Sequence, residues 1–201
     1  PGISAQELSK KQKGAIEKID TYLSGAFPGN EPGAIVLVSI KGNVAYKKAF
    51  GVADVGTKKA LIVEDIMPIA SMTKQFTAVS ILLLAEQHKL SLTDSIQRYI
   101  PEFPSQKFTI TIEHLLAQTS GIREYFDIDE SEYDLLTKEY SPLEIINLFK
   151  KDPLEFEPNS QFRYSNSNYF LLGLIIERVS GKKYGAFLKE NIFEPLGLHQ
   201  S

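Results

Sequence analysis

One long run of apolar residues most constrains what this chain can fold into. The stretch "IASMTKQFTAVSILLLAEQ" predicts a helix over residues 71–88. Because apolar side chains occur on nearly every side of it, we expect this helix to be buried among other elements. Isolated hydroxyls and a glutamate interrupt the run, so it does not have the composition of a membrane span. Its first turn carries a serine and a lysine, Ser71 and Lys74, three residues apart.

Composition narrows the class of protein. The chain has 201 residues, of which 43% are hydrophobic and 23% charged, which suits one domain or two small lobes with a real core. A net charge of −3 gives no basic footprint for nucleic acid. The chain has no cysteine, which excludes thiol catalysis, disulfides and cysteine-ligated zinc within it. The three histidines, at positions 88, 114 and 199, have no metal-site spacing, so no metal site is predicted.

The first third of the chain differs from the rest. Residues 4–24 have helical periodicity and Gly25 is placed to close that helix. Two β-branched runs, residues 33–40 and 44–53, flank a short glycine-containing loop and predict a hairpin. The polar stretch after it predicts a loop. We therefore expect an N-terminal part, residues 1–60, with a helix and a hairpin, and a mainly helical part, residues 61–201.

The second part predicts a succession of short helices. A helical segment at 91–104 is stopped by prolines, and another at 111–121 is expected to end at Gly121. Residues 141–151 begin with a capping box from Ser141 to Glu144. An apolar helix at 167–179 is expected to end at Ser180–Gly181, and a last helix to end near residue 193. The acidic stretch 127–134 predicts a solvated loop.

Ser71 and Lys74 match the pattern Ser-x-x-Lys, which is weak by itself. A second match, Ser180 and Lys183, follows a helix and predicts only a helix end with exposed lysines. Residues i and i+3 share a helix face, so the Lys74 amine can reach the Ser71 hydroxyl. A lysine drawn toward an apolar core needs partners, and an amine beside a serine can activate the hydroxyl as a nucleophile. The alternative for either pair is a helix cap with a solvated lysine.

A second polar cluster lies in "RYSNSNYF", just before the apolar helix at 167–179. Asparagine and serine there are typical of turns and helix N-caps, which is the purely structural explanation. Tyr164 and Asn166, however, alternate in a Tyr-x-Asn pattern that points both side chains one way. A phenol can move a proton and a carboxamide can bind an amide, so the pair also suits an acyl-transfer site.

Together these motifs resemble the serine β-lactamase and penicillin-binding-protein superfamily, in its class C-like branch of D-alanyl-D-alanine carboxypeptidases and esterases. "IASMTKQFTA" resembles the nucleophile motif and "FRYSNSNYFLLGLIIERVSGKKY" the second motif with its helix. "LSLTDSIQRYIPEFP", "ITIEHLLAQTSGI" and "IFEPLGL" resemble connecting segments in the same order. The resemblance implies an α+β, β-lactamase/transpeptidase-like fold with a helical lobe and part of an antiparallel sheet flanked by helices.

The resemblance also implies roles for single residues. Ser71 would be the acylated nucleophile, and its backbone N–H half of the oxyanion hole. Lys74 would accept its proton and organise the site, Tyr164 would act as general base or acid, and Asn166 would bind the substrate amide. Arg123 and Tyr125 would lie at the rim of the substrate cleft. No cofactor is implied.

One family motif has no counterpart in its usual place. The third motif, Lys-Thr-Gly or His-x-Gly on a strand, is absent, and "KYG" at 183–185 instead begins a helix. The C-terminal strands of the fold would then be missing, so we expect a fragment or a nicked protein. A second chain that completes the sheet and a natural short form are the alternatives.

The resemblance therefore predicts a serine hydrolase that forms an acyl-enzyme on an amide, peptide, β-lactam or ester. Peptidoglycan stem peptides, β-lactams and small esters are the expected partners, together with a C-terminal fragment of the same protein that would complete the sheet. The alternative is a catalytically incomplete fragment or a non-catalytic binding module of the same fold. A periplasmic or extracellular location is expected from the resemblance alone.

Overall fold

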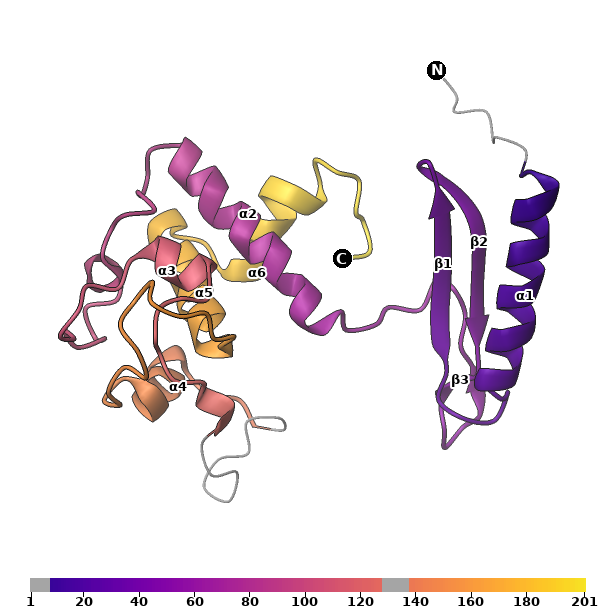
Figure 1. Cartoon of the computed structure of the whole chain (residues 1–201), viewed down its shortest axis with the longest axis horizontal. Helices are drawn as coiled ribbons and strands as arrows, with labels where there is room; N and C mark the ends of the chain where they lie inside the picture. Colours follow the sequence, from indigo (N-terminus) through magenta and orange to yellow (C-terminus); the bar gives the residue numbers. More distant parts are fainter. Residues whose placement is uncertain (1–7, 128–137) are drawn as a thin grey trace. The chain divides into compact units, whose positions relative to one another are not determined.

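The computed structural model describes residues 8–127 and 138–201 and has two compact units, residues 1–67 and 68–201 (Figure 1). The division falls between Met67 and Pro68, whereas the sequence suggested a division after residue 60. Residues 4–7 of the expected first helix and 128–134 of the acidic stretch lie outside the described residues. Within the described ranges, none of the helices is both long and apolar enough to cross a membrane.

In the first unit, one helix lies along a β-hairpin (Figure 1). Helix α1, Lys10–Ala26, is capped by Ser9 in a capping box with Gln12, so it begins after residue 9. Gly25 lies in its last turn and does not end it, contrary to expectation. Strands β1, Ala34–Ile40, and β2, Asn43–Phe50, are antiparallel.

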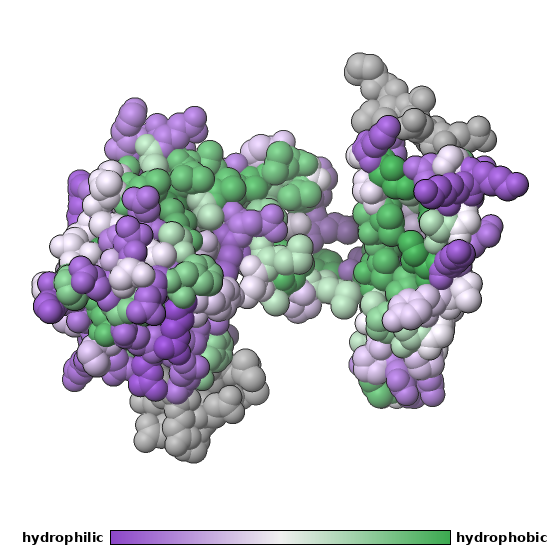
Figure 2. All heavy atoms as spheres, viewed as in Figure 1, coloured by the Kyte–Doolittle hydropathy of each residue, from purple (hydrophilic) through white to green (hydrophobic). Residues whose placement is uncertain are grey.

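The hairpin turn consists of two residues, Lys41 and Gly42. Their φ angles of +51° and +81° are both in the left-handed region that tight two-residue hairpin turns require. On the face of the hairpin next to α1, the Asp20 carboxylate accepts hydrogen bonds from Tyr46 Oη and Lys48 Nζ, each at 2.7 Å. Leu37 of β1 is 53% exposed, and Figure 2 shows apolar surface over the hairpin.

The expected second strand, residues 44–53, is broken at Gly51. Gly51 has a φ of +72°, and its backbone crosses that of Gly33 so closely that a Cβ on Gly51 would lie 2.7 Å from Gly33 Cα. Beyond the break, β3, Val52–Asp54, pairs with β4, Lys59–Ala60, in the stretch expected to be only a loop. The expected strand is therefore interrupted where the backbones of Gly51 and Gly33 come close together. A pattern of β-branched residues does not reveal such a close approach.

The second unit is a helical lobe around one core. Helix α5, Asn166–Ser180, packs against α2, Thr73–Glu86, against α3, Ile112–Leu116, and against α6, Tyr184–Leu188. Between and around them lie α4, Pro142–Phe149, the 3-10 turns η1, Ala70–Met72, η2, Ile96–Arg98, and η3, Tyr125–Asp127, and the π-turn η4, Lys189–Phe193. The most deeply buried side chains come from most of these elements and include Ile81, Leu84, Ile96, Ile112, Leu115, Ile146, Leu171 and Ile175.

Several helix predictions are confirmed and others are wrong in part. The capping box of Ser141 and Glu144 begins α4, and Gly181, with a φ of +70°, ends α5. The segment 91–104 forms only the single turn η2, and α2 is buried on one side only, since Leu82 is 50% exposed.

Gly121 has a different function from the one expected. Helix α3 already ends at Leu116, so this glycine is not its cap. With a φ of +77°, Gly121 instead lets its loop meet another backbone, because a Cβ there would lie 2.2 Å from the carbonyl oxygen of Phe156.

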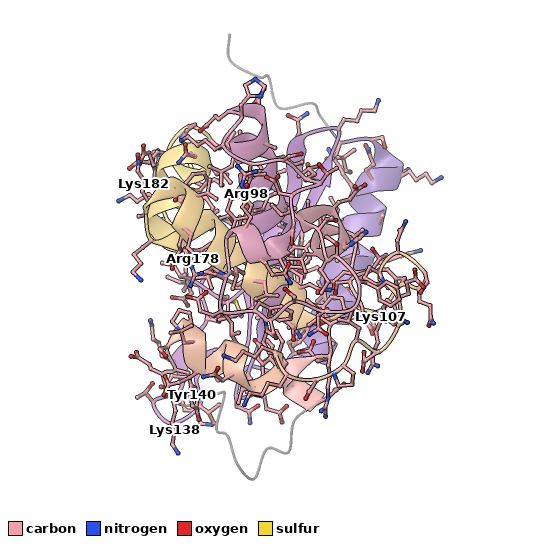
Figure 3. All side chains as sticks on the ribbon, turned by 90° about the vertical axis from the view of Figure 1, so that its left-hand side faces the viewer. Arg98, Lys107, Lys138, Tyr140, Arg178 and Lys182 are labelled. Atoms are coloured by element: carbon pink, nitrogen blue, oxygen red, sulfur yellow. The ribbon has the colours of Figure 1, made fainter. Side chains whose placement is uncertain are left out.

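The C-terminal part of α5 is tied to the loop after η2 by an arginine. Arg178, labelled in Figure 3, donates from Nη1 and Nη2 to the two carboxylate oxygens of Glu102, at 2.7 and 2.9 Å. Nη1 also donates to the backbone oxygen of Tyr99 at 2.8 Å. A two-pronged bond of this kind fixes orientation more firmly than a single contact, so α5 has a defined position in the lobe.

We predict that Gly33→Ala destabilises the first unit by about 2–3 kcal/mol, because the overlap must be relieved by backbone movement. A Cβ at Gly33 would lie 1.6 Å from the Phe50 carbonyl oxygen. Hydrogen exchange should show lost protection of the β1 and β2 amides. Gly29→Ala is the matched control, since a Cβ there meets nothing within 4 Å. Equal protection in both variants would contradict the crossing.

Candidate active site

Ser71 lies in η1, immediately before α2, and its side chain is exposed. The preceding residue, Ala70, has a φ of +46°, in the left-handed region that costs a non-glycine residue about 1–2 kcal/mol. Lys74 lies in the first turn of α2, and its Nζ donates to Ser71 Oγ at 3.2 Å. The helix therefore brings the amine over the hydroxyl, as the i and i+3 spacing predicts.

Tyr164 and Asn166, which are distant in the sequence, contact Ser71 and Lys74. Tyr164 Oη lies 2.7 Å from Ser71 Oγ, the shortest contact that the serine side chain makes among described residues. Asn166, the first residue of α5, accepts at Oδ1 from Lys74 Nζ at 2.7 Å and from Tyr164 Oη at 3.3 Å. The four residues singled out from the sequence thus form one hydrogen-bonded cluster.

The directions of these bonds depend on the protonation state of Tyr164. The Lys74 ammonium can only donate, so Ser71 Oγ accepts from it. Tyr164 Oη lies within hydrogen-bond distance of both Ser71 Oγ and Asn166 Oδ1, and either hydroxyl can donate in the Ser71–Tyr164 bond. When Tyr164 is the phenolate it has no proton to donate, so the serine hydroxyl is then the donor, as a proton transfer from serine to tyrosine requires.

Electrostatics make the phenolate form of Tyr164 easier to reach than in an ordinary tyrosine. Burial raises the pKa of Tyr164 and the Glu124 carboxylate raises it further, but the hydrogen bonds with Lys74 and Ser71 and the Lys74 charge lower it more. The net pKa lies below the ordinary value of 10.0. Lys74 Nζ also lies 4.8 Å from the centre of the Tyr164 ring, close enough for cation–π attraction.

A buried polar network holds the start of α5. Gln118 Oε1 accepts from the backbone N–H of Ser165 at 3.0 Å and from Asn168 Nδ2 at 2.6 Å. Ser120 Oγ donates to Asn168 Oδ1 at 2.6 Å. Since Ser165 lies between Tyr164 and Asn166, this network fixes the loop that carries both.

A cavity of about 690 Å³ opens beside the cluster. Ser71, Lys74 and Asn166 line it, and so does the expected rim residue Tyr125. Arg123, the other expected rim residue, is not among its lining residues, and it binds Asp152 and the backbone of Asp127 instead. Aromatic and apolar side chains that the sequence did not single out make up much of the rest of the wall: Phe126, Tyr169, Phe170 and Leu174.

The other candidate groups have structural roles. Ser180 Oγ accepts from the backbone of Lys182 just after α5, as expected for a helix end. His114 Nδ1 accepts from the Thr111 backbone at the start of α3, and burial lowers the pKa of His114. Lys183 precedes α6, so the letters "KYG" are the start of a helix. Across 8–127 and 138–201, no three histidine or acidic side chains are grouped to hold a metal ion.

Comparison with known sequences finds one family. The sequence profile named Beta-lactamase matches residues 21–201. The chain is 36% identical over 168 residues to Penicillin-binding protein 4* of Bacillus subtilis (strain 168), covering 83% of the chain and 37% of that protein. It is also 36% identical over 186 residues to Protein flp of Staphylococcus aureus (strain MW2), covering 90% of the chain and 36% of that protein. The chain thus spans little more than a third of the length of these relatives.

Solved structures have the same fold. A penicillin-binding protein homologue from Pyrococcus abyssi, described as octameric, superposes with a TM-score of 0.76 at 31% identity, over 93% of this chain and 43% of that one. EstCE1, described as a hydrolase with promiscuous acyltransferase activity, gives a TM-score of 0.82 at 26% identity, over 94% and 53% of the two chains. The expected β-lactamase/transpeptidase-like fold is confirmed, and the chain belongs to the Beta-lactamase family.

Proposed function

We propose that this chain is a serine hydrolase that forms an acyl-enzyme at Ser71 on an amide, peptide, β-lactam or ester. The observation that carries the proposal is the contact of 2.7 Å between Ser71 Oγ and Tyr164 Oη, with Lys74 Nζ at 3.2 Å from the same serine oxygen. Covalent acyl transfer needs a nucleophile, a proton acceptor of lowered pKa and a cation beside both.

In the first step, Tyr164, as the phenolate, takes the Ser71 proton while Oγ bonds to the substrate carbonyl carbon. The carbonyl oxygen gains negative charge in the tetrahedral intermediate. When this collapses, the carbon–nitrogen or carbon–oxygen bond of the leaving group breaks. Tyr164 returns the proton to that leaving group, and the acyl group stays on Ser71. Water then attacks the acyl carbon while Tyr164 takes a proton from it. The bond between that carbon and Ser71 Oγ breaks, Tyr164 returns the proton to Ser71, and a carboxylic acid is released.

Lys74 acts in this scheme as a fixed cation rather than as the proton acceptor. Its Nζ already donates to Ser71 Oγ and to Asn166 Oδ1, so it stabilises negative charge on Tyr164 and on the attacking oxygen. The Nδ2 group of Asn166 has no acceptor among the described residues, so it is available to donate to a substrate carbonyl. This agrees with the role that the resemblance implies for Asn166.

The relatives support a range of acyl donors. One is named Penicillin-binding protein 4* and one a penicillin-binding protein homologue, and another solved relative, at 27% identity, is a D-amino acid amidase from Ochrobactrum anthropi SV3 complexed with L-phenylalanine amide. The aromatic wall of the cavity suits an acyl group with an apolar side chain. A periplasmic or extracellular location remains part of the proposal and rests on the family resemblance alone.

A second candidate is a binding module of the same fold that does not turn over its ligand. One observation favours it. The Lys-x-Gly letters "KYG" at 183–185 lie at the start of helix α6 and not on a strand beside the cluster. Such a module would bind the same ligands without a covalent step.

We predict that a fluorescent penicillin or an activated ester labels the chain covalently at Ser71, because Ser71 Oγ is exposed beside the cavity. Mass spectrometry of the digested protein should find the acyl group on the peptide that contains Ser71. Ser71→Ala should abolish labelling, whereas Ser180→Ala, in the second Ser-x-x-Lys match, should label as the parent does. Reversible binding without an adduct would support the non-catalytic module instead.

Tyr164→Phe should slow acylation by about 10²–10⁴-fold, since it removes only the proton-accepting oxygen. Stopped-flow measurement of the labelling rate checks this. Tyr22→Phe, at a tyrosine of α1 that is 75% exposed, is the control and should have no effect. An acylation rate within threefold of the parent in Tyr164→Phe would assign the proton to another acceptor.

The acylation rate should rise with pH through an inflection below 10.0, because the phenolate of Tyr164 is the active form and its pKa is lowered. Lys74→Met removes the cation and hydrogen bond that lower this pKa, so the inflection should move to higher pH, in addition to a loss of rate. Lys89→Met, beyond the end of α2, is the control. An inflection that moved to lower pH in Lys74→Met would contradict the assigned charges.

A further inference from the structure

The mechanism leaves one buried acid without a role, Glu124, in the loop between α3 and η3. It is 9% exposed, and each of its carboxylate oxygens accepts from a backbone N–H. Oε1 accepts from Phe126 at 3.1 Å, and Oε2 accepts from Asn166. It makes no ion pair with any described residue. A buried carboxylate is costly unless it is bonded, so both of these bonds matter to the loop.

Glu124 supplies the cap that α5 lacks locally. Ser165 occupies the N-cap position, but its side chain makes no capping bond, and its buried Oγ has no partner among described residues. The Glu124 carboxylate instead binds the N–H of Asn166, the first residue of the helix. A negative charge at a helix N-terminus is favourable because the helix dipole is positive there.

A serine clamps the loop of Glu124 to the same helix turn. Ser167 Oγ donates to the backbone oxygen of Arg123 at 2.6 Å and accepts from the backbone N–H of Tyr125 at 3.0 Å. Residues on both sides of Glu124 are therefore bonded to the first turn of α5. The carboxylate has little freedom to move away from Asn166.

The position of Asn166 determines the geometry of the acyl-transfer cluster. Its Oδ1 receives Lys74 Nζ at 2.7 Å and Tyr164 Oη at 3.3 Å, so its backbone must be fixed for both bonds to form. Four titratable groups face Tyr164: Lys74 from α2, Glu124, Tyr125 from η3, and Tyr169 from α5. Of these, Lys74 and Glu124 carry opposite charges.

We infer that Glu124 is a positioning residue for acyl transfer at Ser71. It holds the backbone of Asn166 so that the side-chain oxygen meets Lys74 and Tyr164, and it places a negative charge opposite Lys74. This inference rests on the proposed function. In support, burial raises the pKa of Tyr125 and the Glu124 charge raises it further, and at Tyr164 the same charge adds to the effect of burial and opposes that of Lys74. Glu124 and Lys74 therefore have opposite effects on the phenol that accepts the serine proton.

Two substitutions at Glu124 separate the bond from the charge. Glu124→Gln keeps an oxygen for the Asn166 N–H and removes the charge, while its NH2 group replaces the acceptor of the Phe126 N–H. Glu124→Asp keeps the charge and shortens the reach to Asn166. Glu113→Gln removes a carboxylate from the first turn of α3, away from Tyr164, and is the matched control. All four proteins, including the parent, carry tyrosine labelled with ¹³C at Cζ, and Tyr164→Phe identifies the Tyr164 signal.

We expect the NMR titration midpoint of Tyr164 to fall in Glu124→Gln, because the substitution removes a negative charge that raises the pKa of Tyr164. The pH inflection of acylation should fall by the same amount. Glu124→Asp should leave the midpoint unchanged and slow acylation about tenfold through the loosened Asn166. Glu113→Gln should match the parent in both measurements.

The inference is overturned if the Tyr164 midpoint is the same in Glu124→Gln and the parent, or if Glu124→Asp acylates as fast as the parent. A merely structural role would lower the rate in both variants without moving the midpoint. Failure of the parent to acylate at Ser71 would overturn the proposed function instead. The tyrosine titration needs no substrate, so it would still decide whether Glu124 acts on Tyr164.

Discussion

The candidate site depends on one buried amide, the side chain of Gln118. Its Oε1 receives the backbone of Ser165 and the side chain of Asn168, so it joins the loop after α3 to the first turn of α5. Leaving such buried donors without an acceptor would cost about 1–3 kcal/mol each. Arg163 donates its backbone N–H to the Gln118 backbone oxygen at 3.0 Å, which extends the same attachment to the residue before Tyr164. Tyr164 and Asn166 therefore have fixed positions on either side of Ser165, and the cluster with Ser71 and Lys74 can form.

Local patterns in the sequence predicted most elements of the second unit. The capping box that begins α4 and the glycine that ends α5 were found correctly, because the bonds that define them join residues only a few positions apart. The errors arise where distant backbones meet. Gly51 and Gly121 looked like a strand residue and a helix end, yet each accommodates a crossing with another backbone segment. Nothing near these glycines in the sequence distinguishes a crossing from a cap.

The same difference between local patterns and long-range contacts applies to the candidate site. Ser71, Lys74, Tyr164 and Asn166 could be named because two short motifs carry them, and the structure brings the two motifs together. Glu124 and the aromatic wall could not be named, because their relation to the site arises only when the loop after α3 packs on α5. A single glutamate in a loop carries no periodic or spacing signal. Its burial and its two backbone donors become visible only in three dimensions.

The partners of Lys74 explain how a single cation can serve the proposed chemistry. Among the described residues, no carboxylate pairs with its Nζ, which donates to the oxygens of Ser71 and Asn166 and lies near the rings of Tyr164 and Tyr169. A carboxylate in direct contact would neutralise much of the cation's field at the phenol. Neutral acceptors satisfy the ammonium protons but leave its charge to act on Tyr164.

Glu124 and Lys74 bind different parts of Asn166. Glu124 bonds to the backbone of Asn166, whereas Lys74 bonds to the side chain of the same residue. The negative charge therefore balances the half-buried cation through an intervening residue and does not pair with it directly. A direct ion pair would hold Lys74 away from Ser71, whereas separation by one asparagine keeps the amine at the serine and the acid at the helix end.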